Sequence, residues 1–341
     1  MKFNFKNLKI VEKLKIFLPI TLAILLTGII LIFTIGMNIG LDFSGGAQVQ
    51  ISFGEFDSAE QKQGALEIVR DTCQENGFEI GQERWSSTDE SESLEIGLEY
   101  KLNGEEVNAN NEDAQTEFLK NIKENLEEQL ILNLNEGLEL DLVVNENVSS
   151  RIVHSTTANR LLKNALWATA VAVVAILIYI AFRFTISSGL AAIIALVHDV
   201  LFMFALVTFF QIQINTTFIA AIITIVGYSI NATIVIFDRV RELKKLPSMA
   251  NATDSEIANK AIENTLSRSI LTSVTTLITI IALSVVCAIL GVPSMQEFAL
   301  PIIFGIIGGF YSSVFLSAPI WVHLRKFGKF IKNLKFKSKK A

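Results

Sequence analysis

Five stretches without a charged residue restrict what this chain can fold into. They are bounded by Lys15 and Asp42, Lys163 and Arg183, Asp199 and Asp238, Arg268 and Glu297, and Glu297 and Arg325. A helix that crosses a hydrocarbon core of about 30 Å needs about 20 predominantly apolar residues, and each stretch supplies that length. The stretch after Asp199 is long enough for two crossings, and polar residues at 211–215 divide it.

Six membrane-spanning helices are therefore expected, near 15–37, 163–183, 188–210, 216–237, 269–290 and 298–322. Helices are the expected form because lipid offers the backbone no hydrogen-bond partner. A hydrophobic content of 51% and a mean hydropathy of +0.46 agree with extensive lipid contact. The first stretch follows several lysines, as in a signal peptide. However, it is longer than the roughly 7–15 residues of such a core and lacks a small-x-small cleavage site, so we expect an uncleaved span.

The basic residues predict the orientation, because cytoplasmic loops carry an excess of Lys and Arg. They gather in residues 1–14, in the predicted loop 238–267 and in the tail 324–341, whereas the turns around Gln211 and Gly291 contain none. Six crossings, the last five within 161–323, put all three basic segments on one side. We therefore expect a multi-pass protein of the cell membrane (inner or plasma), with both ends cytoplasmic and residues 38–160 outside.

The expected outer segment, residues 38–160, is strongly acidic. It has 26 Asp and Glu against 8 Lys and Arg, a net charge of −18, while the rest of the chain carries +13. The basic part suits the anionic inner leaflet of a membrane. The acidic part argues against a nucleic acid as partner, although such acidity often serves only to keep a surface solvated.

No signature of enzyme chemistry is present. Cys73 and Cys287 lie in different segments, so no disulfide is expected, and no Cys/His cluster has metal-ligand spacing. His154, His198 and His323 are scattered, and neither a glycine-rich phosphate loop nor a nucleophile triad occurs. We expect a protein that is not an enzyme and needs no cofactor or metal.

Residues 38–160 have the periodicity of an α+β domain. Residues 48–53 alternate polar and apolar, as a half-buried strand does. Ser58 and Gln61 have the spacing of a helix cap, and the helix is expected to stop at Asn76–Gly77. Strands follow near 78–87 and 93–100, then a helix through 118–130 and a last strand that begins at 138–143. This β-α-β-β-α-β order predicts a ferredoxin-like fold.

Several polar residues fall inside the predicted spans, where a charge costs at least about 2.5–3.5 kcal/mol. The third span contains His198 and Asp199, the fourth Thr217, Thr224, Asn231 and Asp238 at seven-residue intervals beside Gly227, and the fifth Arg268, Thr272, Thr275 and Thr279 on one face. Hydrogen bonds between helices are the simpler explanation for the threonines, and Arg268 can also extend to the inner interface. Asp199 lies deepest, which makes it a candidate functional residue. The spacing of Gly305 and Gly309 predicts close helix packing.

Four motifs carry a family resemblance. Gly40-Leu41-Asp42-Phe43-Ser44-Gly45-Gly46, directly after the first span, is similar to the Gly-x-Asp-Phe-x-Gly-Gly signature of the SecD/SecF protein-export proteins. Residues 226–242, which include Gly227, Asn231, Asp238 and Arg239, resemble the fourth-span signature of SecF, and residues 197–200 and 266–269 also match. The motif order, the spacing and the six-span plan resemble the SecF family, of the resistance-nodulation-division superfamily, along the whole chain.

The resemblance implies a subunit that pairs with SecD beside the SecYEG channel, touches the translocating preprotein and membrane lipid, and uses an ion gradient. In many SecF proteins the fourth span reads Asn-Asp-Thr, and its Asp is taken as a proton relay opposite the fifth-span Arg. This chain reads Asn231-Ala232-Thr233 and keeps Arg268. Ion coupling is then expected to use Asp199 or a SecD carboxylate. For Asp199, we expect Arg268 or His198 as the cation and Asn231 as a polar contact.

The segment with Gly40, Asp42, Gly45 and Gly46 is expected to be structural. Adjacent glycines suit backbone conformations that a Cβ strains. Asp42 is expected to accept backbone N–H bonds and to join the first span to the first outer strand.

Two alternatives from other classes remain. One is half of a small-molecule or lipid exporter of the same superfamily, although such exporters usually carry two six-span halves in one chain. The other is a non-transporting scaffold of the translocase, which Ala232 favours. Capture of SecD and SecY separates both from the exporter, and export kinetics with and without a proton gradient separate motor from scaffold.

Overall fold

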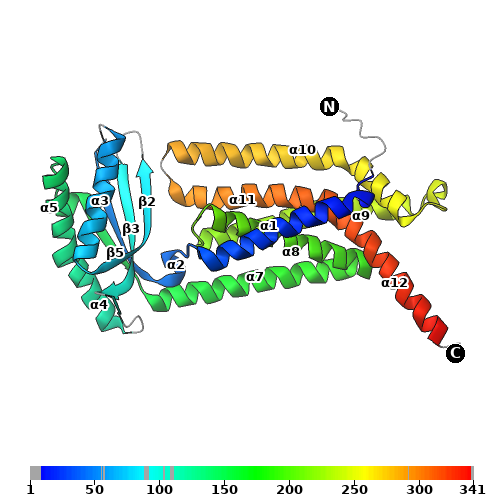
Figure 1. The fold of residues 1–341 in the computed structure, drawn as a ribbon, viewed down its shortest axis with the longest axis horizontal. Coiled ribbons are helices and arrows are strands. Elements are labelled where there is room, and N and C mark those ends of the chain that lie inside the picture. The colour runs from blue at the N-terminus through cyan, green and yellow to red at the C-terminus, as the bar shows by residue number, and fades with distance from the viewer. Residues whose placement is uncertain are drawn as a thin grey trace.

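A bundle of long helices with an α+β domain at one end makes up the molecule (Figure 1). The computed structural model describes residues 9–338, except 55, 57, 88–91, 103, 108–110 and 291. Within these residues, six helices are long and apolar enough to cross a membrane. They are α1 (Leu14–Thr34), α7 (Ser155–Arg183), α8 (Ile186–Phe209), α9 (Thr216–Leu243), α10 (Asp254–Ile289) and α11 (Pro293–Ser312), which continues through a π-helical turn (Ser313–Ser317) into α12 (Ala318–Ser338). The chain is an α-helical membrane protein, as predicted.

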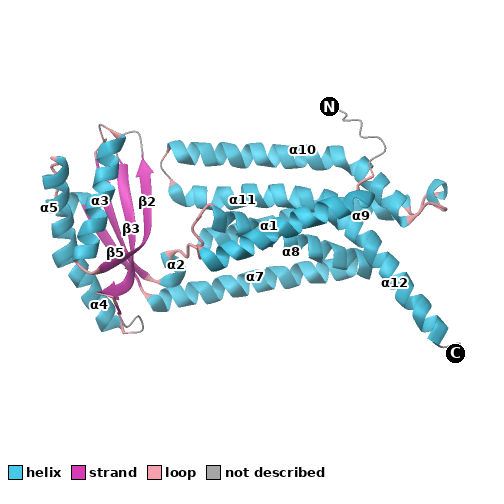
Figure 2. Cartoon of the chain, viewed as in Figure 1, coloured by secondary structure: helices cyan, strands magenta, loops and turns pink. Residues whose placement is uncertain are grey.

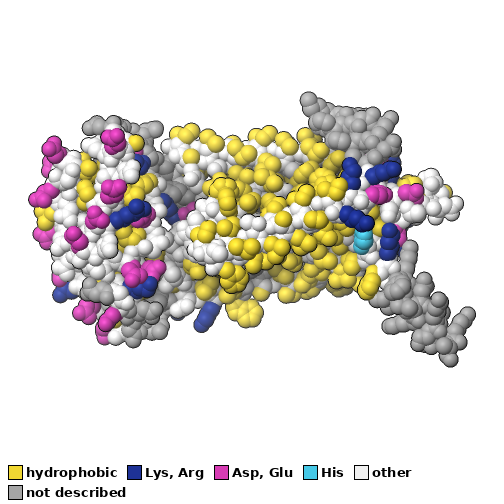
Figure 3. All heavy atoms as spheres, in the orientation of Figure 1, with side chains coloured by type: hydrophobic (Ala, Val, Ile, Leu, Met, Phe, Trp, Pro, Cys, Tyr) yellow, Lys and Arg dark blue, Asp and Glu magenta, His cyan; other side chains and the backbone are white. Residues whose placement is uncertain are grey.

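The surface of the bundle agrees with a lipid environment. Figure 3 shows a broad hydrophobic band over the helices, acidic side chains on the α+β domain, and Lys and Arg at the opposite end. The α+β domain is named the outer domain after its predicted location. Large apolar side chains such as Phe33 and Phe182 are more than four-fifths exposed. An apolar surface of this size is unfavourable in water and favourable in lipid.

The helices extend beyond the predicted spans. Residues 238–267, expected as a loop, are mostly helical, because α9 continues to Leu243 and α10 begins at Asp254. A capping box starts α10: the Thr253 hydroxyl accepts the Glu256 N–H, and the Glu256 carboxylate accepts the Thr253 N–H. The first turns of α10 bury Ile257, Ala261 and Ile262. Apolar burial therefore supports this helix where its sequence is too polar for lipid.

The outer domain is an antiparallel sheet with helices on one face (Figure 2). Its main elements are β1 (Gly46–Phe53), α3 (Ala59–Glu75), β2 (Phe78–Ser87), β3 (Glu92–Leu102), α4 (Glu112–Asn121), a π-helical turn (Ile122–Leu126), α5 (Glu127–Leu138) and β5 (Val148–Val153). The described strands are ordered β2-β3-β1-β5, with the short β4 (Glu105–Glu106) paired to β3. Short helices α2 (Leu41–Ser44) and α6 (Val144–Asn147) precede β1 and β5.

Most predictions made from local sequence signals in this domain are correct. The Ser58 hydroxyl accepts the Gln61 N–H at the start of α3, and Gly77 adopts a φ of +77° just after that helix. The last strand was predicted wrongly at 138–143. There α5 continues to Leu138, and Asn135 holds the following loop through two hydrogen bonds of 2.9 Å to the backbone of Leu142. Apolar residues of this loop enter the core without pairing, and β1 pairs with 148–153 instead.

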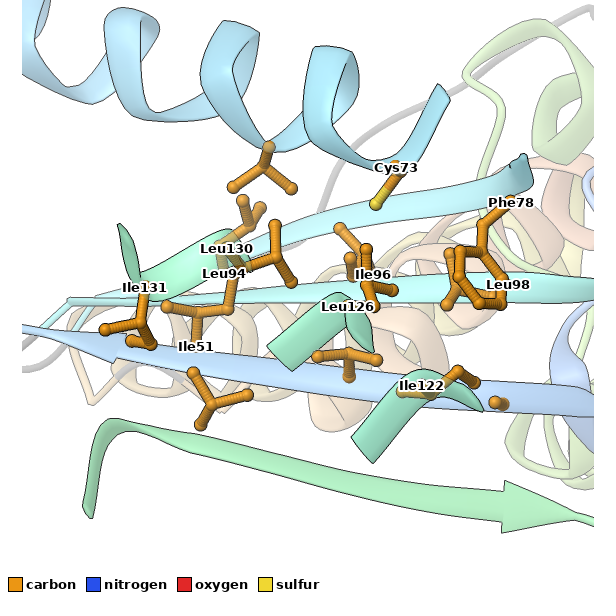
Figure 4. Packing of buried hydrophobic residues seen from close by; sticks show 14 of the residues in the cluster. Ile51, Cys73, Phe78, Leu94, Ile96, Leu98, Ile122, Leu126, Leu130 and Ile131 are labelled. Atoms are coloured by element: carbon orange, nitrogen blue, oxygen red, sulfur yellow. The ribbon is translucent and has the colours of Figure 1, made fainter. Parts of the chain in front are cut away.

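Alternation along the strands gives the sheet two different faces. Ile51, Leu94 and Ile96 are fully buried against the helical layer, together with Leu126 and Leu130 (Figure 4). The opposite face presents polar residues, among them Gln48, Gln82, Arg84, Glu95 and Arg151, to the outer end of the bundle. The α3–α5 layer lies on the side away from the bundle (Figure 1). A polar sheet face is therefore turned toward the membrane helices.

Candidate functional site

Asp199 lies in the centre of the bundle and is completely buried. Its Oδ1 atom is 2.8 Å from Nδ1 of His198, and its Oδ2 atom accepts a hydrogen bond from the Ser229 hydroxyl of α9. The His198 ring stacks on Phe202 and lies 6.0 Å from the Tyr311 ring of α11. This cluster places a carboxylate, an imidazole and a hydroxyl in contact away from water. Such groups can accept, hold and return a proton.

Glycines on α11 permit this close arrangement. A Cβ on Gly309 would lie 3.3 Å from Cβ of Ser229 and 3.6 Å from Oδ2 of Asp199. One turn earlier, a Cβ on Gly305 would lie 2.4 Å from Ile225, which leaves no room for a larger residue. The predicted close packing at Gly305 and Gly309 is therefore present, and it brings α11 against the carboxylate.

Two expected partners of Asp199 are not beside it. Arg268 and Asn231 are exposed on the surface of this chain, whereas Asp199 is buried. Asn231 is two residues after Ser229, a rotation of about 200° around a helix of 3.6 residues per turn, so it faces the opposite way. The expected contacts with Arg268 and Asn231 were therefore wrong within the single chain, and His198 alone of the proposed cations is in contact.

The exposed polar residues form a face across α9 and α10. It contains Thr224, Gly227 and Asn231 of α9, and Arg268, Thr272, Thr275 and Thr279 of α10. Each of its threonine hydroxyls bonds a carbonyl of its own helix, four residues back, at 2.8–3.0 Å. A Cβ on Gly227 would meet no atom within 4 Å. The hydrogen bonds between helices that we expected for these threonines are therefore replaced by bonds within each helix.

Asp238 and Arg239 lie near the C-terminal end of α9. Arg183, the last residue of α7, donates to both oxygens of Asp238 at 2.6 Å. Arg239 donates to Glu242 at 2.8 Å. The first contact joins the end of α7 to α9, whereas the second lies within α9, and neither involves Asp199.

The glycine segment after α1 adopts a conformation that requires glycine. Gly45 and Gly46 have φ angles of +73° and +142°, and a Cβ on Gly46 would lie 2.3 Å from the carbonyl oxygen of Leu98. Oδ2 of Asp42 accepts the Thr216 hydroxyl at 2.7 Å and the Thr216 N–H at 3.3 Å, at the first residue of α9. Asp42 thus accepts a backbone N–H, as predicted, but the donor lies at the start of α9 and not in α1 or β1. Gly40 also donates its N–H to Ile214, at 2.9 Å.

Gly46→Ala is expected to destabilise the outer domain by about 3 kcal/mol or more, because backbone strain adds to the overlap with Leu98. Urea unfolding of the purified full chain, with Trp167 and Trp321 replaced by Phe so that only Trp85 fluoresces, measures this loss. Gly54→Ala is the matched control, since a Cβ at Gly54 meets no atom within 4 Å. Equal stability of the two variants contradicts the structural role of Gly46.

A second polar cluster joins the outer domain to the bundle. The Arg84 guanidinium of β2 contacts Glu297 of α11 and Gln213 of the α8–α9 turn, and lies 3.5 Å from Glu95. Asn215, the N-cap of α9, donates to the same Glu297 carboxylate. Sequence reasoning missed the Arg84–Glu297 ion pair, since 213 residues separate the two side chains.

Among the described residues, no group of three or more His, Cys, Asp or Glu side chains could hold a metal ion.

Comparisons with known proteins agree with these features. The family model "Protein export membrane protein SecD/SecF, C-terminal" matches residues 137–327, and the "SecD/SecF GG Motif" matches residues 30–55. Protein translocase subunit SecF of Sebaldella termitidis is 31% identical over 323 residues, which cover 95% of this chain and 94% of that protein. SecF of Calditerrivibrio nitroreducens is 31% identical over 91% of this chain and 92% of its own length.

A solved structure has the same fold. The crystal structure of SecDF, a translocon-associated membrane protein from Thermus thermophilus, matches with a TM-score of 0.68 at 27% identity. The match covers 96% of this chain and 40% of that one.

Proposed function

This chain belongs to the SecF family of protein translocase subunits, and we propose that it works with SecD at a SecYEG channel, where ion movement promotes preprotein export. The buried Asp199, in contact with His198 and Ser229, carries this proposal. A carboxylate inside a bundle is costly to bury, so its presence there marks a candidate functional residue. The scaffold alternative gives this carboxylate no task, and the full-length relatives are translocase subunits rather than exporters.

Export from membrane vesicles that contain this chain, SecD and SecYEG tests the proposal. The rate is expected to rise when a proton or sodium gradient is applied. If the export rate responds to neither gradient while the assembly stays intact, the chain acts as a non-transporting scaffold of the translocase.

The association with SecD, which the SecD/SecF family implies, is assigned here to the polar face of α9 and α10. Arg268 and Asn231 are exposed on that face, and polar groups in lipid need partners. A neighbouring SecD helix can approach at Gly227 and supply a carboxylate for Arg268. In this arrangement, a carboxylate of SecD takes the place of the fourth-span Asp that is Ala232 in this chain.

Gly227→Trp is expected to lower the amount of SecD that co-purifies with the chain by at least about fivefold, because the indole occupies the space of the neighbouring helix. Quantitative affinity capture from membranes measures it. Ala168→Trp, at an exposed position of α7, is the control and leaves capture unchanged. A similar yield for both variants refutes this assignment of the SecD face.

We also infer that the outer domain is ferredoxin-like and that it lies outside the cell membrane. The β-α-β-β-α-β order of the main elements and the sheet order β2-β3-β1-β5 support the fold. The start of α1 and the end of α12 both lie at the end of the bundle opposite this domain (Figure 1), which supports two cytoplasmic ends.

Cysteine labelling from outside intact cells tests the orientation. Glu136→Cys on α5 is expected to react with a membrane-impermeant maleimide, and Ala250→Cys, between α9 and α10, is expected not to. Native Cys73 does not interfere, because burial raises the pKa of its thiol to about 12 and the thiolate is the reactive form. Labelling at 250 but not at 136 reverses the orientation.

A further inference from the structure

A polar cleft lies between the sheet of the outer domain and the outer end of the bundle. It has a volume of about 570 Å³. Amide side chains are prominent in its lining: Gln48 and Gln82 on the sheet, and Asn38, Gln211, Gln213 and Asn215 on the bundle. Its acidic residues Asp42, Glu83, Glu95 and Glu297 outnumber the basic residues Arg84 and Arg151. Arg84 is paired with Glu297 and lies 3.5 Å from Glu95.

Amide side chains have the hydrogen-bonding groups of a peptide bond. Each carries N–H donors and a carbonyl acceptor, so it can pair with the backbone N–H or C=O of any residue. Three amides of the lining already bind main chain within this protein. Gln82 donates to the carbonyl of Ile39 at 2.5 Å, Asn38 to that of Gln211 at 2.9 Å, and Gln211 to that of Thr208 at 2.7 Å.

We propose that this cleft binds the main chain of an extended polypeptide through its amide side chains, and that its occupant is the translocating preprotein. The inference rests on the proposed function and names the substrate contact. A translocase must accept many sequences, and only the backbone is common to all of them. Recognition through backbone hydrogen bonds therefore gives affinity without sequence preference.

The composition of the cleft favours this occupant over a folded partner. The core of a stable protein–protein interface is enriched in aromatic and other apolar side chains. Amides and charged groups make up most of the lining of this cleft, and Trp85 and Phe210 are among its fewer apolar residues. Arg151 donates to Gln48 at 2.8 Å, and Gln213 donates to Gln82. A peptide strand can replace one partner of such a pair, because its N–H and C=O groups are also a donor and an acceptor.

Peptide binding to the purified full chain in lipid nanodiscs tests the proposal. The probes are a fluorescent, unstructured peptide of about twelve residues, a scrambled version, and the original sequence N-methylated at alternate residues. Scrambling is expected to change Kd by no more than about twofold. N-methylation is expected to weaken binding by about tenfold or more, because each methyl group removes a backbone donor. Equal affinity for the methylated peptide, a strong effect of scrambling, or no binding overturns the proposal.

Variants of the chain locate the binding. Gln48→Leu and Gln82→Leu are expected to weaken binding of the unmodified peptide severalfold. Gln63→Leu is the matched control, since Gln63 is exposed on α3 and bonds Glu67 in the helical layer. Equal loss in all three variants overturns the assignment to the cleft.

A cross-linking arm identifies the natural occupant. Benzoylphenylalanine at position 48 is expected to capture a translocation-arrested preprotein, whereas the same group at position 63 does not. Capture of SecD alone at position 48, or loss of peptide binding when SecD is added, makes the cleft a subunit contact and overturns the proposal. Peptide binding that persists while export ignores every gradient instead counts against ion coupling, so the two failures are distinguishable.

Discussion

Asp199→Asn is expected to reduce gradient-driven export to the rate measured without a gradient. Asparagine keeps the size of the side chain and an acceptor for the Ser229 hydroxyl, but it cannot bind and release a proton. Assembly with SecD is therefore expected to be preserved while coupling is lost. Export from vesicles, with and without an imposed gradient, measures the difference.

Asp254→Asn is the matched control, since Asp254 pairs with Arg325 at 2.7 Å at the start of α10, remote from His198 and Ser229. Its export is expected to keep the gradient response. Ala232→Asp, which introduces the acid common in the family, is expected to restore part of the proton dependence in the Asp199→Asn background. Normal gradient-driven export by Asp199→Asn means that coupling lies in SecD or is absent.

Arg84→Glu is expected to detach the outer domain from the bundle. The side chains of Arg84 and Glu297 are only 27% and 12% exposed, so the substitution puts a new carboxylate beside those of Glu297 and Glu95 in a poorly solvated place. We expect the docked arrangement to lose about 2 kcal/mol, less than a fully buried pair loses, because Arg84 keeps some solvent contact. Spin labels at positions 136 and 290, in full-length protein in nanodiscs, should give a broader distance distribution.

The exchanged pair Arg84→Glu with Glu297→Arg is expected to restore the narrow distribution. Arg70→Glu serves as the control, because Arg70 pairs with Glu83 within the outer domain and is half exposed. A broad distribution in the control, or a narrow one in Arg84→Glu alone, shows that the ion pair does not hold the domain.

Membrane spans and helix caps could be predicted because their signals are local. An uncharged stretch has one stable form in lipid, and the Ser58–Gln61 cap depends on a spacing of three residues. The strand at 138–143 failed because alternation indicates only which residues are buried. Leu142 is indeed buried, but it lies in a loop, and pairing with β1 was decided by a competing segment.

The candidate site was only partly predictable, for a related reason. Depth within a span pointed to Asp199, and adjacency brought in His198. The partner Ser229 depended on how α8 and α9 are rotated against each other, which side-chain type alone does not reveal. Arg84 and Glu297 are ordinary surface charges in the sequence, and their meeting depends on where the whole outer domain sits.

The outer domain is connected directly to a membrane helix, so a tilt of that helix can move the domain. Strand β5 ends at Val153 and α7 begins at Ser155, so His154 alone separates them. Of the described α7 side chains, only Ala158 and Ile180 are buried, which leaves the helix weakly held by its neighbours. A helix of this length extends roughly 43 Å, and a tilt of about 10° around its inner end moves the outer end by about 7 Å. Because only His154 lies between the strand and the helix, we expect a tilt of α7 to displace the sheet by a similar distance.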